Sequence, residues 1–460
     1  MSEASLNGES AAGGEALPAR VEQWIERLGE HRGLVGILGL GYVGLPLGLA
    51  FAEAGFQVLG FDVDPEKVET LQRGECYIEH LEASRIASAR RDDRLTATSD
   101  FDRLGEPDAL LICVPTPLDR FRQPNLDYVE STAREISRRL RPGQLVVLES
   151  TTYPGTTDDL LRRTLDASGL ECGSDYYLAF SPEREDPGNL EFGTTGIPKV
   201  IGGLGQAATR MAEVLYRDVF TGTVTVSSTR AAEATKLTEN IFRAVNIALV
   251  NELKVVYDAM GIDVWEVLDA AATKPFGFMR FTPGPGWGGH CIPVDPFYLS
   301  WKAREFGQTA RFVELAGEVN IEMPRYVVGK LQNELNKRTL PMRGSRVLLL
   351  GLAYKPDIAD PRESPAFEIL ELLHEAGAET AYHDPYIPKA PSMRTWPELP
   401  PLESVPLDAE TLKAQDAVLV VTNHRSVDYG LVLEHAPLIL DTRGVYRGGS
   451  ALEAKKVVKA

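Results

Sequence analysis

Residues 33–62 read GLVGILGLGYVGLPLGLAFAEAGFQVLGFD, and this stretch decides the fold. It begins with an apolar run of strand length, passes through a glycine-rich turn into an apolar helical pattern, and ends in a second apolar run. Buried strands that alternate with helices are typical of βαβ units in a parallel sheet. The stretch therefore predicts strands over 35–39 and 57–62 on either side of a helix over 44–54.

The turn has the glycine spacing of a dinucleotide site. Gly39 suits the tight turn, Gly41 leaves room for a pyrophosphate, and Gly44 lets the helix pack closely on the strand. Asp62 follows the second strand, where an acid accepts a hydrogen bond from the ribose of NAD and would repel the 2′-phosphate of NADP. A turn needed for packing alone is the alternative, but the strand, helix and acid favour an NAD site.

The same alternation continues along the chain. Further elements are predicted at 65–73, 109–114, 127–140 and 145–149, and a weaker second copy at 346–351, 364–376, 379–384 and 417–421. The second copy has Gly351-Leu352-Ala353-Tyr354 at its turn and lacks the further glycines, so we expect it to bind a different ligand. Proline-rich residues 384–407 predict a loop.

A long helix is expected between the two copies. Residues 228–261 contain no internal glycine or proline and carry apolar residues around most of the helix circumference, which favours burial between domains or subunits. The predicted fold class is α/β, with two doubly wound Rossmann-like sheets joined by this long central helix and a helical middle domain. The expected domains are a flexible extension with a short helix (1–32), an NAD-binding domain (33–227), a central helical domain (228–325) and a C-terminal α/β domain (326–460).

Composition excludes several classes of protein. The 460 residues are 43% hydrophobic and 25% charged, as in globular chains. A net charge of −18 without a basic stripe argues against nucleic-acid binding. We find no apolar run of membrane-spanning length, no signal-peptide pattern, no CxxC pair and no HExxH motif. The sequence predicts a cytoplasmic protein in a reducing compartment, without a metal site.

A glycine-rich loop carries a candidate nucleophile. Cys291 follows four glycines within residues 284–289 and precedes a helical pattern beginning near Pro296. A helix N-terminus favours the thiolate, so Cys291 is a candidate for covalent catalysis, with Asp295 near enough to orient a reacting group or water. A buried, inert cysteine is an equally open interpretation, because free cysteines are usually buried.

Other polar residues fall where a site would be expected. Lys236 and Asn240 share one face of the long helix and would suit stabilisation of a developing alkoxide, although the spacing alone favours a polar seam at a domain junction. Residues 149–152 and 181–186 follow predicted strands, at the edge where α/β sheets bind ligands. Exposed turns would account equally for these polar residues.

Taken in order, the motifs resemble the nucleotide-sugar 6-dehydrogenase family, which includes UDP-glucose and GDP-mannose dehydrogenases. The residues that carry the resemblance are GLGYVGLPL (39–47), VPTP (114–117), EST (149–151), SPERE (181–185), KLTEN (236–240), GPGWGGHCIPVDP (284–296) and KPDIADPRESPA (355–366). ATKPFGFM (272–279) and GGHCIPVDPFYLSWKARE (288–305) are most similar to the branch that oxidises UDP-N-acetylglucosamine or a related UDP-N-acetylhexosamine.

The resemblance implies a four-electron oxidation of the sugar C6 hydroxyl by two NAD⁺ in turn. An aldehyde would add to Cys291 as a thiohemiacetal, be oxidised to a thioester and be hydrolysed to the uronic acid, a precursor for polysaccharide biosynthesis. Lys236 and Asn240 would stabilise the oxyanion, Asp295 and Thr151 would handle the water, and Glu183 would act as a base. The long helix would form the core of a homodimer, and the C-terminal domain would hold UDP.

The resemblance also implies two sets of binding residues. The cofactor set is Gly39, Gly41, Tyr42, Val43, Gly44, Asp62, Lys67, Thr116, Ser150, Thr151 and Arg362. The substrate set is Glu183, Arg184, Lys236, Asn240, Arg280, Phe281, Gly288, Lys355 and Arg443.

Other functions stay open at this point. The same chemistry on UDP-glucose or UDP-N-acetylgalactosamine is one alternative. A hydroxyacid-type dehydrogenase that transfers a single hydride would share the first domain and the long helix but would not need a reactive thiol. A nucleotide-sensing protein with a structural cysteine would bind both ligands without producing NADH.

Overall fold

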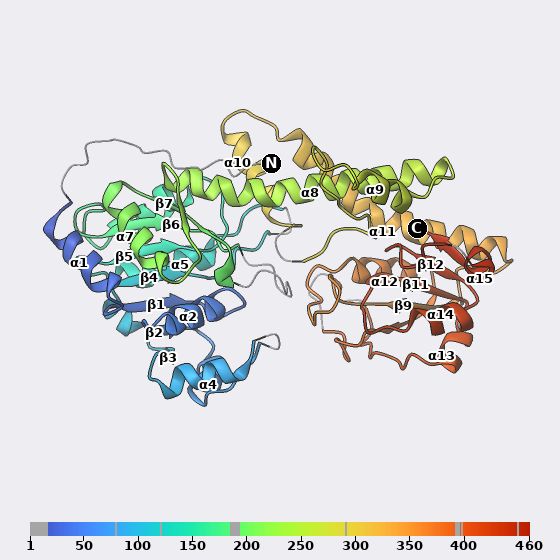
Figure 1. Ribbon diagram of the computed structural model, residues 1–460, viewed down its shortest axis with the longest axis horizontal. Helices are drawn as coiled ribbons and strands as arrows, with labels where there is room; N and C mark the ends of the chain where they lie inside the picture. The colour runs from blue at the N-terminus through green and yellow to red at the C-terminus, as the bar shows by residue number, and fades with distance from the viewer. Residues whose placement is uncertain are drawn as a thin grey trace.

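The computed structural model describes residues 17–78, 81–119, 122–184, 194–289, 292–391, 396, 399–448 and 450–460. It contains two α/β sheets that lie side by side, with the long helix α8 (Thr229–Ala259) running across both (Figure 1). The predicted α/β class, with two Rossmann-like sheets and a long central helix, is confirmed. Residues 1–16 of the flexible extension expected at 1–32 and the candidate nucleophile Cys291 lie outside the described residues.

The N-terminal sheet has eight strands in the order β3-β2-β1-β4-β5-β6-β7-β8. Its first six strands are parallel, and β7 runs antiparallel to β6. The strands are β1 (Leu34–Leu38), β2 (Gln57–Phe61), β3 (Leu95–Thr98), β4 (Ala109–Ile112), β5 (Leu145–Leu148), β6 (Tyr177–Phe180), β7 (Lys199–Gly203) and β8 (Thr223–Thr225). The six parallel strands have the order of dinucleotide-binding sheets, which places a ligand crevice at their carboxyl ends, beside β1 and β4.

Helices cover both faces of this sheet, so its strands are buried on both sides. One core joins Ile37 and Leu111 to α1 and α7, and the other joins Leu38 and Leu110 to α5. The helical elements are α1 (Ala19–Gly29), α2 (Gly44–Glu53), α3 (Pro65–Gln72), α4 (Ala83–Arg91), η1 (Phe101–Gly105), α5 (Asp127–Ser137), η2 (Thr156–Leu161), α6 (Arg162–Asp166), η3 (Thr194–Gly196) and α7 (Gln206–Arg217).

The middle of the chain is helical. Ser228 caps α8 by accepting a hydrogen bond from the backbone of Ala231, and α8 then packs against β7, α9 (Val264–Ala271), α10 (Asp295–Glu305) and α11 (Arg311–Lys337). One face of α8 is covered by these neighbours. Its other face carries Phe242, Leu249 and Val256, spaced seven residues apart and each close to half exposed.

The C-terminal sheet is entirely parallel, in the order β10-β9-β11-β12-β13. Its elements are β9 (Arg346–Leu350), α12 (Pro365–Glu375), β10 (Glu379–His383), α13 (Ala409–Lys413), β11 (Ala417–Val420), α14 (Tyr429–His435), β12 (Ile439–Asp441), α15 (Ala451–Lys456) and β13 (Val457–Lys459). Helix α11 packs on both α8 and α12, so it links this sheet to the middle helices (Figure 1). Within the described ranges, no helix is long and apolar enough to span a membrane.

Candidate active site

The glycine turn fits a dinucleotide. Gly39 has φ of +93°, which favours glycine, and a Cβ on Gly44 would lie 1.9 Å from the carbonyl oxygen of Gly39. A Cβ on Gly41 would meet nothing within 4 Å, so this part of the turn opens onto free space. The first and third glycines are therefore required by packing, whereas the second leaves room for a pyrophosphate beside the N-terminal end of α2.

Asp62 closes this site at the end of β2. Its carboxylate accepts hydrogen bonds from the backbone of Leu40 at 2.8 Å and of Asp64 at 3.0 Å, and Lys67 Nζ lies 3.6 Å away. A carboxylate can accept about four hydrogen bonds, so these contacts leave acceptor capacity for a ribose hydroxyl. Tyr42 of the turn is partly exposed, and the guanidinium of Arg362 from the C-terminal domain lies 4.4 Å from the centre of its ring.

Hydroxyl groups tie together the strand ends beside the turn. Thr116 Oγ1 donates to the carbonyl of Thr151 at 2.8 Å, and Ser150 Oγ donates to the carbonyl of Val114 at 2.6 Å. Tyr298 of α10 donates to the carbonyl of Thr116 at 2.6 Å. The predicted cofactor residues Thr116, Ser150 and Thr151 thus lie at one edge of the sheet, and Thr116 contacts the helix that follows the cysteine loop.

A polar cluster forms where α8 meets the start of α10. Asn240 donates an amide hydrogen bond to the Asp295 carboxylate and accepts one from Arg243, which fixes the orientation of the amide. Lys236 lies one helical turn before Asn240 and donates to the carbonyl of Glu183. Lys236, Asn240 and Asp295 are all buried. The structure brings these predicted residues together, although they are far apart in the sequence.

Burial has a strong effect on Asp295. It raises the pKa of this carboxyl from 3.8 to about 6, although Lys236, Asn240 and Arg243 all favour the charged form. An acid with such a pKa exchanges a proton readily near neutral pH, as general acid–base catalysis requires.

The turn after β6 completes this cluster. The carboxylate of Glu183 accepts a hydrogen bond from the backbone of Arg184 at 2.7 Å. Arg184 pairs with Glu239 of α8 at 2.7 Å and donates to the carbonyl of Pro198. Residues 185–193 lie outside the described residues, so the rest of the SPERE motif is not placed.

The C-terminal domain reaches the segment that precedes Cys291. The backbone N–H of Gly289 donates to the carbonyl of Arg362 at 3.2 Å, and Cβ atoms on Gly288 or Gly289 would overlap Tyr354. A Cβ on Gly284 would lie 2.4 Å from the guanidinium of Arg443. Glycine is therefore needed because the loop and the second sheet are in close contact.

Arg443 is a cation whose guanidinium donates to a main-chain carbonyl. Its Nε donates to the carbonyl of Val421 at 2.6 Å, and burial lowers its pKa to about 10. Such a group suits an anionic ligand. Lys355, half-buried, follows Tyr354.

Two predicted substrate residues have contacts elsewhere. Arg280 is exposed and pairs with Asp269 at 2.6 Å, while Phe281 packs edge-on against Phe242 of α8. Neither of these contacts involves Lys236, Asn240 or Asp295.

Two buried acids next to the site were not assigned roles from the sequence. Glu149 is paired with Lys199 of β7 at 2.6 Å and accepts a hydrogen bond from Tyr216. Glu233, one turn before Lys236, accepts from the backbone of Gly155 and Thr157. The sequence spacing gives no sign of the contacts of Glu149 or Glu233, because their partners come from distant elements.

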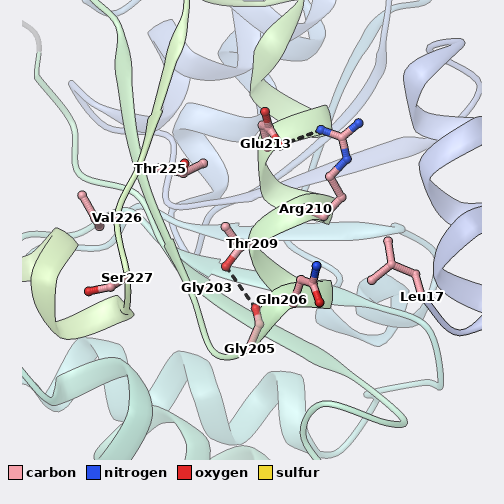
Figure 2. Close-up of a pocket in the computed structure, with 10 residues that line it drawn as sticks. All are labelled: Leu17, Gly203, Gly205, Gln206, Thr209, Arg210, Glu213, Thr225, Val226 and Ser227. Carbon is pink, nitrogen blue, oxygen red and sulfur yellow. Dashed lines mark hydrogen bonds and ion pairs between the residues drawn. The ribbon is translucent and has the colours of Figure 1, made fainter. Parts of the chain in front are cut away.

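A cavity of about 740 Å³ lies away from this cluster, at the N-terminal end of α7. Figure 2 shows Arg210 paired with Glu213 and Thr209 bonded to Gly205 along its wall. It contains none of the predicted site residues.

Comparisons with known proteins agree with this geometry. Models of the UDP-glucose/GDP-mannose dehydrogenase family match three successive parts: the NAD-binding domain at 34–220, the central domain at 230–322 and the UDP-binding domain at 348–448. The UDP-N-acetyl-D-mannosamine dehydrogenase of Pyrococcus horikoshii is 33% identical over 90% of this chain and 96% of its own. The UDP-N-acetyl-D-glucosamine 6-dehydrogenase of Pseudomonas aeruginosa is 34% identical over 85% of this chain and 90% of its own.

A solved structure supports the same relationship. That of the Pyrococcus horikoshii UDP-D-ManNAc dehydrogenase superposes with a TM-score of 0.83 at 30% identity, covering 93% of this chain and 98% of that one. This protein therefore belongs to the UDP-glucose/GDP-mannose dehydrogenase family, with an NAD-binding domain followed by a central and a UDP-binding domain.

Proposed function

We propose that this enzyme oxidises the C6 hydroxyl of a UDP-N-acetylhexosamine to a carboxylate in two NAD-dependent steps, through a covalent adduct of Cys291. The observation that carries the proposal is the buried cluster of Lys236, Asn240 and Asp295, at the start of the helix whose Tyr298 contacts Thr116. Bound NAD⁺ supplies the hydride acceptor for each oxidation.

The cluster provides what the oxidations require. The Lys236 ammonium and the Asn240 amide offer hydrogen-bond donors to the C6 oxygen as negative charge develops on it. The amide is held by Asp295 and Arg243, so it needs no reorganisation during the reaction. Asp295, with its pKa of about 6, orients water and exchanges its proton together with Thr151.

Cys291 keeps the reactive carbon on the enzyme. Its thiolate adds to the aldehyde, the adduct is oxidised to a thioester, and water releases the acid while Glu183 takes a proton. Described residues on both sides of Cys291 support this assignment, because Gly289 contacts Arg362 and Asp295 contacts Asn240. A covalent adduct also prevents the loss of the aldehyde during cofactor exchange.

We propose UDP-N-acetylglucosamine as the substrate, with UDP-N-acetylmannosamine as the competing epimer. Similarity to a glucosamine 6-dehydrogenase supports the first sugar, and similarity to a mannosamine dehydrogenase supports the second at almost the same identity. We propose that Arg443 and Lys355 contact UDP. The proposed domains are an NAD-binding domain of residues 33–227, a central domain of 228–325 and a C-terminal domain of 326–460.

We also propose a homodimer in the cytoplasm. The apolar stripe of Phe242, Leu249 and Val256 on α8 supports a contact between two copies, because three half-exposed apolar residues at a spacing of seven form a continuous helix face.

The test is to incubate the protein with NAD⁺ and, in separate reactions, the UDP derivatives of N-acetylglucosamine, N-acetylmannosamine, N-acetylgalactosamine and glucose. Two NADH per uronic acid, fastest with the glucosamine derivative, is the expected result. Cys291→Ser should stop at the aldehyde after one NADH. Formation of acid at the wild-type rate by Cys291→Ser would refute the covalent mechanism.

A further inference from the structure

A fully buried lysine lies beneath the turn that contains Glu183. Lys199 begins β7 and is 2% exposed. Its ammonium is 2.6 Å from a carboxylate oxygen of Glu149, 3.1 Å from the carbonyl of Pro182, and 3.9 Å from Oε2 of Glu183. The lysine thus contacts both the main chain of this turn and the acid proposed as the base.

The surroundings exclude water from this contact. The rings of Tyr216 and Phe220 lie 5.4 and 5.2 Å from the Lys199 ammonium. Burial alone would lower the pKa of Lys199, but Glu149 and Glu183 outweigh it and keep the pKa above its ordinary value. Lys199 therefore stays charged. Burying a cation costs several kcal/mol before pairing, so a well-packed apolar side chain would serve packing alone at least as well.

The turn that contains Glu183 forms hydrogen bonds with β7 on one side and with α8 on the other. Ser181 donates its hydroxyl to the carbonyl of Val200, next to Lys199, while the Glu183 carbonyl accepts from Lys236 of α8. Lys199 lies beside Oε2 of the Glu183 carboxylate, while Oε1 accepts a hydrogen bond from the backbone N–H of Arg184. Removing Lys199 would take the positive charge away from Oε2, so the carboxylate would be held less firmly, while the Asn240–Asp295 hydrogen bond between α8 and α10 would remain.

We propose that Lys199 is a positioning residue that holds the Glu183 carboxylate for hydrolysis of the thioester. The inference rests on the proposed function. In this step water attacks the acyl carbon and passes one proton to Glu183, the C–S bond breaks, and the Cys291 thiolate leaves with the bonding pair. The product acid loses its remaining proton to solvent, so no electron acceptor is needed.

The experiment compares Lys199→Met with Lys199→Arg in rapid-mixing assays of the full-length protein with NAD⁺ and its preferred UDP-sugar. The first NADH should form at nearly the wild-type rate, whereas steady-state turnover should fall roughly 10- to 100-fold, as expected when a reacting group is displaced. When the reaction of Lys199→Met is quenched with acid, intact-protein mass spectrometry should show the acyl group on Cys291. Lys199→Arg keeps the positive charge, so it should accumulate much less of this adduct.

Two further variants separate positioning from stability. Lys199→Met/Glu149→Gln removes the fully buried Glu149 charge that Lys199→Met alone would leave without its cation, so it should fold where the single variant does not, and it should accumulate the same adduct. Lys254→Met removes another lysine that is 2% exposed, on α8, and should lower the melting temperature without accumulating adduct.

The outcomes discriminate clearly. If the wild type yields two NADH per acid but the Lys199 variants slow both oxidations equally, or carry no adduct, the role of Lys199 is wrong and the proposed function stands. If the wild type yields fewer than two NADH per sugar, the proposed function itself fails, and the role of Lys199 fails with it.

Discussion

The two sheets begin with the same strand–turn–helix frame, yet only the first turn has open space. Gly39 and Gly351 both have positive φ values near 90°, and each precedes a turn whose backbone is held by a strand-end acid. Beyond that glycine the turns differ. Gly41 faces free space, whereas Ala353 is buried and its carbonyl accepts from Thr422 at 2.6 Å.

The strand-end acids differ in the same way. Asp62 accepts from two backbone N–H groups and has Lys67 at its edge. Asp384 accepts from four, at Leu352, Ala353, Tyr386 and Ile387, and its remaining capacity is taken by the buried ring of His424. A shared frame therefore suits a dinucleotide only where its second position is open and its acid keeps capacity to accept a further hydrogen bond.

The largest effect should come from Gly44→Ala, matched with Gly41→Ala. A Cβ at position 44 would overlap the Gly39 carbonyl, so we expect a loss of about 4 kcal/mol or more in unfolding free energy. Gly41→Ala should change stability by less than about 0.5 kcal/mol but weaken NAD binding. Urea denaturation and NAD titration measure both. Equal stability losses would show that the turn has no open position.

The second-largest effect is expected from replacing the two strand-end acids, Asp384 and Asp62, one at a time. Asp384→Ala leaves four N–H groups, three of them buried, and His424 without their acceptor, and should cost about 3 to 5 kcal/mol. Asp62→Ala leaves two N–H groups and should cost about 1 to 2 kcal/mol. Chemical denaturation at pH 7 measures the difference, and a larger loss for Asp62→Ala would reverse the comparison.

The buried acids Asp295 and Asp384 should change the unfolding free energy with pH in opposite directions. Burial raises the pKa of Asp295 from 3.8 to about 6, so this group makes folding less favourable as pH rises through that interval. For Asp384, the effect of burial is outweighed by His424 and backbone N–H groups, and its pKa falls below 3.8. Its stabilisation is present above that value and is lost as the pH falls through the lower folded value.

Unfolding free energies at pH 4, 5, 6 and 7 test these signs. Asp295→Asn should gain up to about 3 kcal/mol relative to wild type between pH 4 and 7. The deficit of Asp384→Asn should be constant over this range and shrink only below it. A gap between wild type and Asp295→Asn that does not change with pH would contradict the burial effect.

The smallest expected effect is on cofactor affinity. Asp62→Ala should raise the dissociation constant for NAD about tenfold, which corresponds to one lost hydrogen bond to a charged acceptor. Glu69→Gln is the matched control, since it removes an exposed acid of α3 outside the predicted cofactor set and should leave the affinity unchanged. Unchanged affinity in Asp62→Ala would remove the proposed ribose contact.

Strong patterns made most of the fold predictable. The strand expected at 35–39 is β1 (Leu34–Leu38), and the helix expected at 228–261 is α8 (Thr229–Ala259), because both are long or fully apolar. Helix α4 (Ala83–Arg91) was missed since it carries few apolar residues, and β13 (Val457–Lys459) since it is three residues long. Local patterns carry too little signal for such elements.

The site was predictable only where motifs mark it. Lys236, Asn240 and Asp295 were named from the sequence and lie in one cluster, while Cys291 is outside the described residues and its role stays a prediction. Lys199 was missed because a lysine at the start of an apolar strand is normally solvated. Only the tertiary fold shows that Glu149 and Glu183 surround it.

The length of α8 has a consequence for the whole molecule. Its 31 residues span about 46 Å as one uninterrupted rod. Lys236 lies towards one end and Lys254 towards the other, about 27 Å apart at the usual rise. The helix therefore fixes the distance and the relative rotation of the NAD-binding and UDP-binding domains. Adding a single residue in its middle would turn one half by about 100° relative to the other, so we expect its length to tolerate less variation than that of any surface loop.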